Sequence, residues 1–196
     1  EAQDKLISRY IEMRGVINSF GSIDTVNGYQ LKEFDPVVTI KRLGETIANY
    51  YSDKENINYG FIHGDLTLSN SMVDLDTLKV SILDPRGFFG NTNFYGIGDY
   101  DNGKLLYALS GYGEFNNSRS FHIKKLEDGK IEFEIPELIK DGIEDIMEEF
   151  SPIHYLWKIV CWQGLSQYIK CDPVKSICAH YHGLAMAEQY LDLFSK

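Results

Sequence analysis

Three oxygen-bearing side chains are spaced closely enough in this chain to build one chemical site. Asp65 and Asn70 stand five residues apart in the stretch FIHGDLTLSN, in a loop that leaves an apolar segment predicted to be a short buried strand. Asp84 ends the second strand of the hairpin predicted to follow. Because a hairpin brings its two outer ends together, we expect Asn70 and Asp84 to face one another across its open end.

The chemistry available to these three side chains is that of a hard cation beside a proton acceptor. A carboxylate and an amide oxygen suit Mg²⁺, which keeps several of its own waters. The second carboxylate, Asp65, could orient an attacking hydroxyl and receive its proton, as phosphoryl transfer from a nucleotide to an alcohol requires. The competing interpretation makes Asp65 and Asn70 turn formers and Asp84 a solvated strand end. Order, spacing and strand context together favour the chemical interpretation.

The elements that must position this site are mainly helical. Apolar residues recur at helical spacing, and Pro residues preceded by capping side chains mark several helix starts. The helices expected from these signals span residues 4–20, 36–51, 101–110, 136–150, 152–169 and 173–196. Strands are expected near 59–62, at 71–84 as a hairpin that turns near 74–77, and as a second hairpin around Asp128-Gly129. Residues 21–35 read as a polar connection and residues 85–98 as an ordered loop. The predicted fold class is mainly α (α+β), helical with short β-hairpins.

The composition restricts the classes of binding partner and the cellular setting to be expected. The 196 residues suffice for one domain with a core, and the formal net charge of -10 argues against nucleic-acid binding. No apolar run is long enough to cross a bilayer, so no membrane partner is expected. The three cysteines show no CxxC spacing, which favours a reducing, cytoplasmic setting. The chain begins at Glu1 without a methionine and enters a helical pattern at once, so we expect a longer parent chain.

HGDLTLSN followed by ILDPRG resembles the catalytic and metal loops of the aminoglycoside phosphotransferase/choline kinase family, small-molecule kinases with a protein-kinase-like fold. The resemblance implies that Asp65 is the catalytic base and that Asn70 and Asp84 hold Mg²⁺ and, through it, ATP. It implies that His63 supports the catalytic loop. An aspartate just before a helix should accept hydrogen bonds from the backbone of that loop. Within GDYDNGKLLYAL, Asp101 is the better match for this role and Asp99 is the alternative.

Two departures from the family pattern leave the acceptor open. Thr67-Leu68-Ser69 replaces the usual run before the asparagine, and DPRGFFG follows the apolar strand. The second feature is more similar to ketosamine kinases and to kinase-like proteins of bacterial surface-polysaccharide pathways, which implies a sugar or sugar-derived hydroxyl. Arg86 could contact a phosphate or make a loop ion pair.

The resemblance covers the large C-terminal lobe, taken as a single domain over residues 1–196 with its catalytic and metal loops at 61–90. The N-terminal lobe that covers ATP is not recognisable. Lys41 in VTIK imitates the nucleotide-binding lysine but lies only twenty-four residues before Asp65, so a helix-surface role is favoured. We expect the full-length protein to be an ATP- and Mg²⁺-dependent kinase of a small-molecule alcohol, such as a sugar, an amino sugar or an aminoglycoside-like compound, and this fragment alone to be inactive. The alternative is a non-catalytic binding or scaffold module in a surface-polysaccharide pathway.

The remaining candidates are weaker. An acidic helix face could hold substrate amines, although a solvated face is favoured; its members are Glu144, Asp145, Glu148 and Glu149. Aromatic residues of the 152–169 helix are expected in the core rather than in a cage for a cationic substrate; they are Tyr155, Trp157, Trp162 and Tyr168. His180 and His182, two apart on a helix, point to different faces and do not make a zinc pair.

Overall fold

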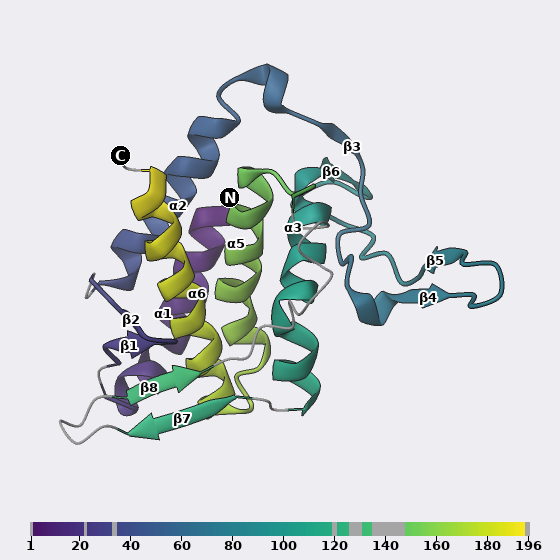
Figure 1. Cartoon of the computed structure of the whole chain (residues 1–196). Helices are drawn as coiled ribbons and strands as arrows, with labels where there is room; N and C mark the ends of the chain where they lie inside the picture. Colours follow the sequence, from purple (N-terminus) through teal and green to yellow (C-terminus); the bar gives the residue numbers. More distant parts are fainter. Residues whose placement is uncertain are drawn as a thin grey trace.

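The computed structural model describes residues 2–21, 23–32, 35–118, 121–125, 131–134 and 148–194. Helices make up most of its fold (Figure 1). The α-helices are α1 (Ala2–Ser19), α2 (Pro36–Tyr50), α3 (Asp99–Tyr107), α5 (Pro152–Tyr168) and α6 (Pro173–Phe194). Shorter helical turns are η1 (Lys54–Asn56), η2 (Leu68–Asn70), η3 (Ala108–Tyr112) and η4 (Glu114–Ser118). The prediction of a mainly helical chain with few short strands is confirmed.

The helix starts and stops follow the local sequence. The side chain of Asp35 accepts a hydrogen bond from Val37 N at 3.0 Å, and Pro36 occupies the first turn of α2, where its missing N–H costs nothing. Chain exit from α1 uses Gly21, whose φ of +90° lies in the left-handed region. Asp172 caps α6 in the same way, accepting from Lys175 N at 3.2 Å. The predicted starts of these helices are confirmed.

The strands form three small sheets. They are β1 (Thr25–Val26), β2 (Tyr29–Gln30), β3 (Tyr59–Phe61), β4 (Ser71–Val73), β5 (Val80–Ile82), β6 (Tyr95–Ile97), β7 (His122–Lys125) and β8 (Ile131–Glu134). The largest sheet has the order β2-β1-β8-β7, with β1 parallel to β8 and the other pairs antiparallel. The other two sheets are the antiparallel pairs β3-β6 and β4-β5. Both predicted hairpins are therefore present as strand pairs.

Three local expectations were wrong or incomplete. The polar connection 21–35 contains the β1-β2 hairpin, which turns at Asn27-Gly28 with positive φ at both residues. The loop 85–98 contributes β6 to a sheet with β3. β3 was expected to be buried, yet Phe61 is 70% exposed, and only Ile62 just beyond the strand is buried. Within the described part of the chain no helix covers the outer face of this two-stranded sheet, so those side chains face solvent.

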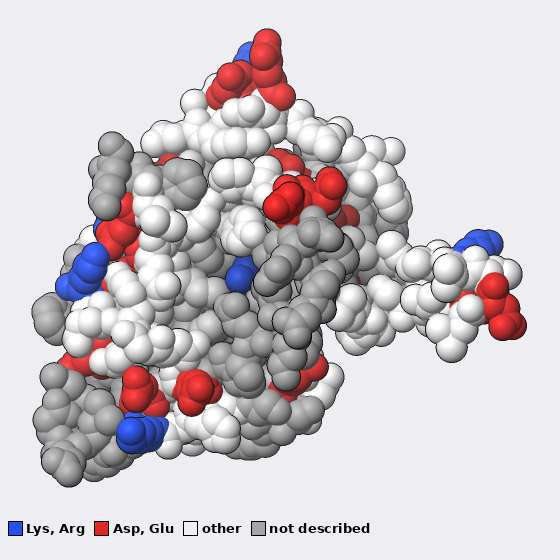
Figure 2. Space-filling view, viewed as in Figure 1, with Lys and Arg blue, Asp and Glu red and all other residues white. Residues whose placement is uncertain are grey.

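The core lies between the long helices. α5 packs against α6, α3 and α1, so it forms the centre of the helical layer (Figure 1). Two clusters of buried apolar side chains flank it, one around Trp162 and Phe133 and the other around Ile40 and Trp157. The pair β4-β5 extends away from this body (Figure 1), and its charged side chains gather near its tip on the face seen in Figure 2.

The predicted helix 136–150 falls largely outside the described residues, which resume at 148. Within the described part of the chain, none of the helices is both long and apolar enough to cross a membrane.

Gly103 sets the distance between α3 and α5. A Cβ atom at this position would stand 2.3 Å from Cβ of Trp157 and 3.0 Å from the carbonyl oxygen of His154. Only glycine permits this close approach, and the approach fixes where α3 presents the polar side chains of its first two turns.

Candidate functional site

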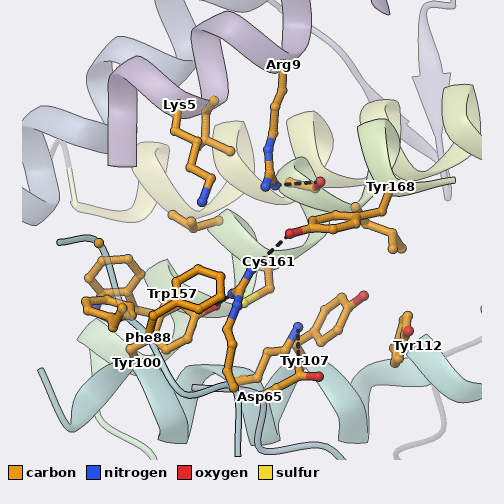
Figure 3. Close-up of a pocket in the computed structure, with 18 of the residues that line it drawn as sticks. Lys5, Arg9, Asp65, Phe88, Tyr100, Tyr107, Tyr112, Trp157, Cys161 and Tyr168 are labelled. Atoms are coloured by element: carbon orange, nitrogen blue, oxygen red, sulfur yellow. Dashed lines mark hydrogen bonds and ion pairs between the residues drawn. The ribbon is translucent and has the colours of Figure 1, made fainter. Parts of the chain in front are cut away.

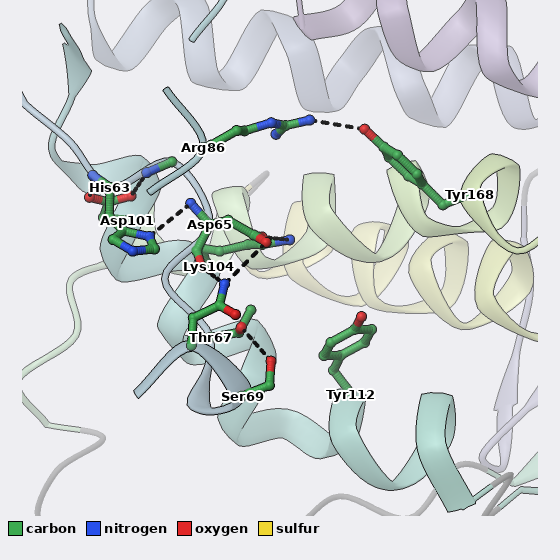
Figure 4. Close-up of polar contacts among 12 residues, drawn as sticks. His63, Asp65, Thr67, Ser69, Arg86, Asp101, Lys104, Tyr112 and Tyr168 are labelled. Carbon is green, nitrogen blue, oxygen red and sulfur yellow. Dashed lines mark hydrogen bonds and ion pairs between the residues drawn. The ribbon is translucent and has the colours of Figure 1, made fainter. Parts of the chain in front are cut away.

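The loop after β3 is held by a carboxylate from α3. Oδ2 of Asp101 accepts a hydrogen bond from His63 N at 2.6 Å, and Oδ1 accepts one from Gly64 N at 2.8 Å (Figure 4). Gly64 adopts a φ of +77°, and this conformation helps both amides reach the same side chain. Asp101 therefore braces the loop residue just before Asp65.

Asp99, the alternative for this role, does different work. Its carboxylate accepts from the hydroxyl of Tyr51 at 2.9 Å and lies 3.1 Å from Nε2 of His154. Trp157 Nε1 donates to the same Tyr51 hydroxyl at 3.0 Å. Burial raises the pKa of the Tyr51 hydroxyl well above its ordinary value, and the hydrogen bond to Asp99 adds to the rise while that from Trp157 opposes it, so the hydroxyl stays a neutral donor to Asp99. Asp99 thus joins α2, α3 and α5 rather than touching the loop.

His63 links the loop to the end of β5. Its Nδ1 accepts from Asp65 N at 3.3 Å, so the ring proton sits on Nε2, which donates to the carbonyl oxygen of Leu83 at 2.8 Å. Arg86 N donates in turn to the carbonyl oxygen of His63 at 2.8 Å. These contacts give His63 a supporting position and tie residues 63–65 to residues 83–86.

Asn70 turns back toward Asp65. Its Nδ2 donates to the carbonyl oxygen of Asp65 at 2.9 Å and lies 3.4 Å from Oδ2 of the same residue. Because the amide nitrogen is used in this way, Oδ1 is the atom of Asn70 that could ligate a cation. The sequence spacing of five residues thus closes a compact loop whose two polar side chains are adjacent.

Lys104 is a member of the site that the sequence interpretation missed. Its Nζ lies 3.1 Å from Oδ1 of Asp65, and its stem is largely buried, with the ammonium 4.7 Å from the ring centroid of Tyr107. Burial works against the charged form of Lys104, but Cys161 and Asp65 outweigh it and raise the Lys104 pKa above its ordinary value. The spacing along the chain could have identified Lys104 as a site residue, because it follows Asp101 by three residues and both therefore lie on one face of α3.

Asp84 lies at the open end of the β4-β5 pair. Leu83 N donates to the carbonyl oxygen of Asn70 at 2.8 Å, so the backbones that carry Asn70 and Asp84 are neighbours, as the hairpin predicted. Asp84 has a φ of +56°, an unfavourable conformation for a residue with a Cβ, and its side chain is exposed.

Asn70 and Asp84 offer an amide oxygen and a carboxylate oxygen, which are hard ligands of the kind that Mg²⁺ takes. Among the described residues, no group of three His, Cys, Asp or Glu side chains could hold a metal ion without other ligands. Further ligands, such as water, would therefore have to complete the coordination of a cation here, as is usual for Mg²⁺ in proteins.

A cavity of about 600 Å³ opens beside Asp65 (Figure 3). Its walls come from α1, α3, α5 and the loop after β5, and carry aromatic residues such as Tyr100, Tyr107 and Trp157. Arg86 is half-buried here and donates to the hydroxyls of Tyr168 at 2.9 Å and Tyr100 at 3.4 Å, rather than making a loop ion pair.

The aromatic residues of α5 divide between core and cavity. Trp162 is fully buried in the core, as expected, and Trp157 is buried while lining the cavity. Tyr168 was expected in the core but is 62% exposed at the cavity edge. It follows the buried stripe of α5 by one further turn, where the helix ends and the core no longer covers it.

The remaining candidates that the structure describes lie outside the site. Lys41 is exposed on α2. Glu144 and Asp145 lie outside the described residues, while Glu148 and Glu149 are exposed before α5. The two histidines of α6 are buried and contact different aromatic rings: His180 stacks on Tyr10, and His182 lies edge-on to Trp162.

Comparisons with protein families, with curated proteins and with solved structures found no match to this chain.

Proposed function

We propose that this chain carries the catalytic half of an ATP-dependent phosphotransferase that phosphorylates a hydroxyl of a small molecule, acting in the cytoplasm. The observation that carries the proposal is the fixed loop. Asp101 holds the backbone of His63 and Gly64, Asn70 holds the carbonyl of Asp65, and the Asp65 side chain borders a cavity of about 600 Å³. A cavity of this size suits a small acceptor.

In the proposed reaction, Asp65 orients the acceptor hydroxyl and takes its proton as the oxygen attacks the terminal phosphorus of ATP; the bond from that phosphorus to the bridging oxygen breaks, and ADP leaves. Lys104, 3.1 Å from Asp65, fixes the direction of that carboxylate and adds positive charge near the transferred group. Asn70 and Asp84 would hold Mg²⁺, which would neutralise phosphate charge when bound. His63 and Asp101 act through the loop by keeping Asp65 in place.

Exposed apolar side chains on the small sheets favour the presence of a further domain that covers them and the nucleotide. Several apolar side chains of the two-stranded sheets are more than half exposed, among them Met72 at 60%, Val80 at 57% and Phe61 at 70%. An apolar surface of this kind is typically covered by another domain or partner. We propose an N-terminal lobe in a longer parent chain as that cover; the same surface would equally suit the scaffold alternative.

Activity distinguishes these two functions. The natural full-length protein is incubated with ATP, Mg²⁺ and a panel of sugars, aminoglycosides and choline-like alcohols, and ADP release is measured. The enzyme hypothesis predicts acceptor-dependent ADP release that chelation by EDTA abolishes. If no acceptor stimulates ADP release while the protein still captures a partner through the β3-β6 and β4-β5 surface, the scaffold function replaces it.

A further inference from the structure

The cavity beside Asp65 is dominated by positive charge, although the chain as a whole has a net charge of -10. Four basic side chains line it: Lys5, Arg9, Arg86 and Lys104. Among the described residues that line the cavity, Asp65 is the single acid. Lys104 pairs with Asp65, so Arg9 and Arg86 are the guanidinium groups that remain to bind an anion in the cavity.

Two arginines from distant parts of the chain meet at Tyr168. The guanidinium of Arg9, on α1, lies 4.8 Å from the Tyr168 ring centroid, and Arg86 donates to the Tyr168 hydroxyl at 2.9 Å. Figure 3 shows Arg9 extending from α1 toward Tyr168, and Figure 4 shows Arg86 reaching the hydroxyl of the same tyrosine. Two guanidinium groups held on one residue make a rigid positive site rather than two independent surface charges.

The hydrogen bonds that Arg9 and Arg86 make go to uncharged oxygen atoms. Nη1 of Arg9 donates to the carbonyl oxygen of Gly164 at 2.8 Å, and Arg86 donates to tyrosine hydroxyls. Neutral oxygens orient a guanidinium without cancelling its charge. The positive charge of both arginines acts on the Tyr168 hydroxyl. Burial would raise the pKa of this hydroxyl, yet Arg86 and Arg9 lower it below its ordinary value.

We infer that the acceptor of the proposed phosphotransfer carries a carboxylate or phosphate group, which binds at Arg9 and Arg86 while its reacting hydroxyl lies at Asp65. Guanidinium groups bind both kinds of anion through paired hydrogen bonds. The aromatic walls offer flat apolar faces to the ring of a sugar acid or sugar phosphate. An amino sugar is disfavoured, because its ammonium group would meet the arginines. This inference rests on the proposed function and specifies its substrate class.

The test compares four probes of one ring shape: glucose, glucosamine, glucuronate and glucose 6-phosphate. ATP-dependent turnover and probe binding are measured separately on the natural full-length protein and on R9Q, R86Q and the matched control R14Q, which removes an exposed arginine of the same helix outside the cavity. We expect an anionic probe to bind more tightly than glucose and glucosamine. R9Q and R86Q should each raise its KM or Kd on the order of 10- to 100-fold, and R14Q should change neither. Glucuronate and glucose 6-phosphate distinguish a carboxylate from a phosphate acceptor.

A second variant, G164A, separates a loss of anion binding from a loss of folding. In G164A the added Cβ would stand 2.5 Å from Nη1 of Arg9, so the flexible guanidinium must move while every charge is kept. We expect the same selective loss of anion binding, with a thermal transition no lower than that of the unaltered protein. Equal binding of all four probes, or equal losses for glucose and for the anions in R9Q, would overturn the inference. Arginine-dependent binding of an anion without any phosphoryl transfer would instead support the anion site and refute the proposed function.

Discussion

Oδ2 of Asp101 lies 2.6 Å from the backbone nitrogen of His63, thirty-eight residues earlier in the chain. The same carboxylate accepts from Gly64 N through Oδ1, so a single side chain of α3 defines the path of the loop that ends at Asp65. The first prediction tests this brace.

D101N replaces one acceptor oxygen by an NH₂ group, which leaves His63 N or Gly64 N without its partner. We expect the free energy of unfolding to fall by about 1–3 kcal/mol and turnover to fall at least tenfold. Hydrogen exchange of the His63 and Gly64 amides should accelerate. The control is D99N, which breaks contacts with Tyr51 and His154 and should leave exchange at His63 and Gly64 slow. Unchanged exchange at both amides in D101N would contradict the role of the brace.

The second prediction concerns the cation. D84N removes one charge, and asparagine tolerates the positive φ of this position, so the backbone should be retained. We expect Mg²⁺-dependent turnover to fall roughly a hundredfold or more, with a higher Mg²⁺ concentration needed for half-maximal rate. D76N, at the exposed tip of the same hairpin, is the matched control. Turnover in D84N equal to that in D76N would refute the assignment of Asp84.

The third prediction uses two glycines with opposite environments. G103A forces a Cβ to within 2.3 Å of Trp157 Cβ and 3.0 Å of the His154 backbone, so α3 must shift from α5. We expect a loss of about 1–3 kcal/mol in the free energy of unfolding, and lower turnover because Asp101 and Lys104 move with α3.

G15A is its control, because nothing lies within 4 Å of an added Cβ on α1. This variant should gain roughly 0.5–1 kcal/mol from helix propensity, with unchanged turnover. Chemical denaturation of both variants provides the comparison, and a stable, fully active G103A would show that the two helices do not need their close approach.

The fourth prediction concerns acid stability. Burial lowers the pKa of His180 to about 4, and burial together with Lys158 lowers that of His182 to about 3. The Nε2 atoms of both rings are buried without a hydrogen-bond partner among the described residues. The folded protein therefore keeps these rings neutral in a pH range where the unfolded chain, with ordinary histidine pKa values near 6.5, binds protons.

It follows that these residues cost no stability above about pH 6.5, and that stability falls as the pH drops from there toward 4, by roughly 1.4 kcal/mol for each unit of pKa difference as an upper limit. Substituting both rings by phenylalanine (H180F/H182F) should flatten the dependence of unfolding free energy on pH over this interval. The measurement is urea denaturation at several pH values. Parallel curves for the two proteins would show that the histidines do not titrate on unfolding.

Helix starts and the β4-β5 turn could be predicted from the sequence, because contacts between residues close in the chain determine them. Asp35-Pro36 and Asp172-Pro173 start helices through contacts within four residues, and the β4-β5 turn is closed by Asp74 accepting from Asp76 N and Thr77 N. The β1-β2 hairpin had an equally local signal in Asn27-Gly28, but two-residue strands are too short for an alternating pattern to be visible.

Contacts between distant segments could not be read from the sequence. Arg9 reaches the cavity because α1 packs on α5, and its partner Gly164 is 155 residues away. The exposure of Phe61 depends on the absence of a covering element over β3-β6 among the described residues, whereas its sequence context is as apolar as that of a core strand. The adjacency of Asp65 and Asn70 could be anticipated from their spacing of five residues, whereas the contact of Asp101 with the loop spans thirty-eight residues and was expected only from the resemblance to the kinase family.

The most direct measurement of the central claim is single-turnover transfer of the terminal phosphate of labelled ATP to an acceptor by the natural full-length protein and its D65N variant. If Asp65 orients the hydroxyl and takes its proton, D65N should bind ATP with unchanged affinity and transfer label roughly 10²–10⁴ times more slowly. Transfer at the same rate in D65N, or no transfer to any acceptor by the unaltered protein, would contradict the account.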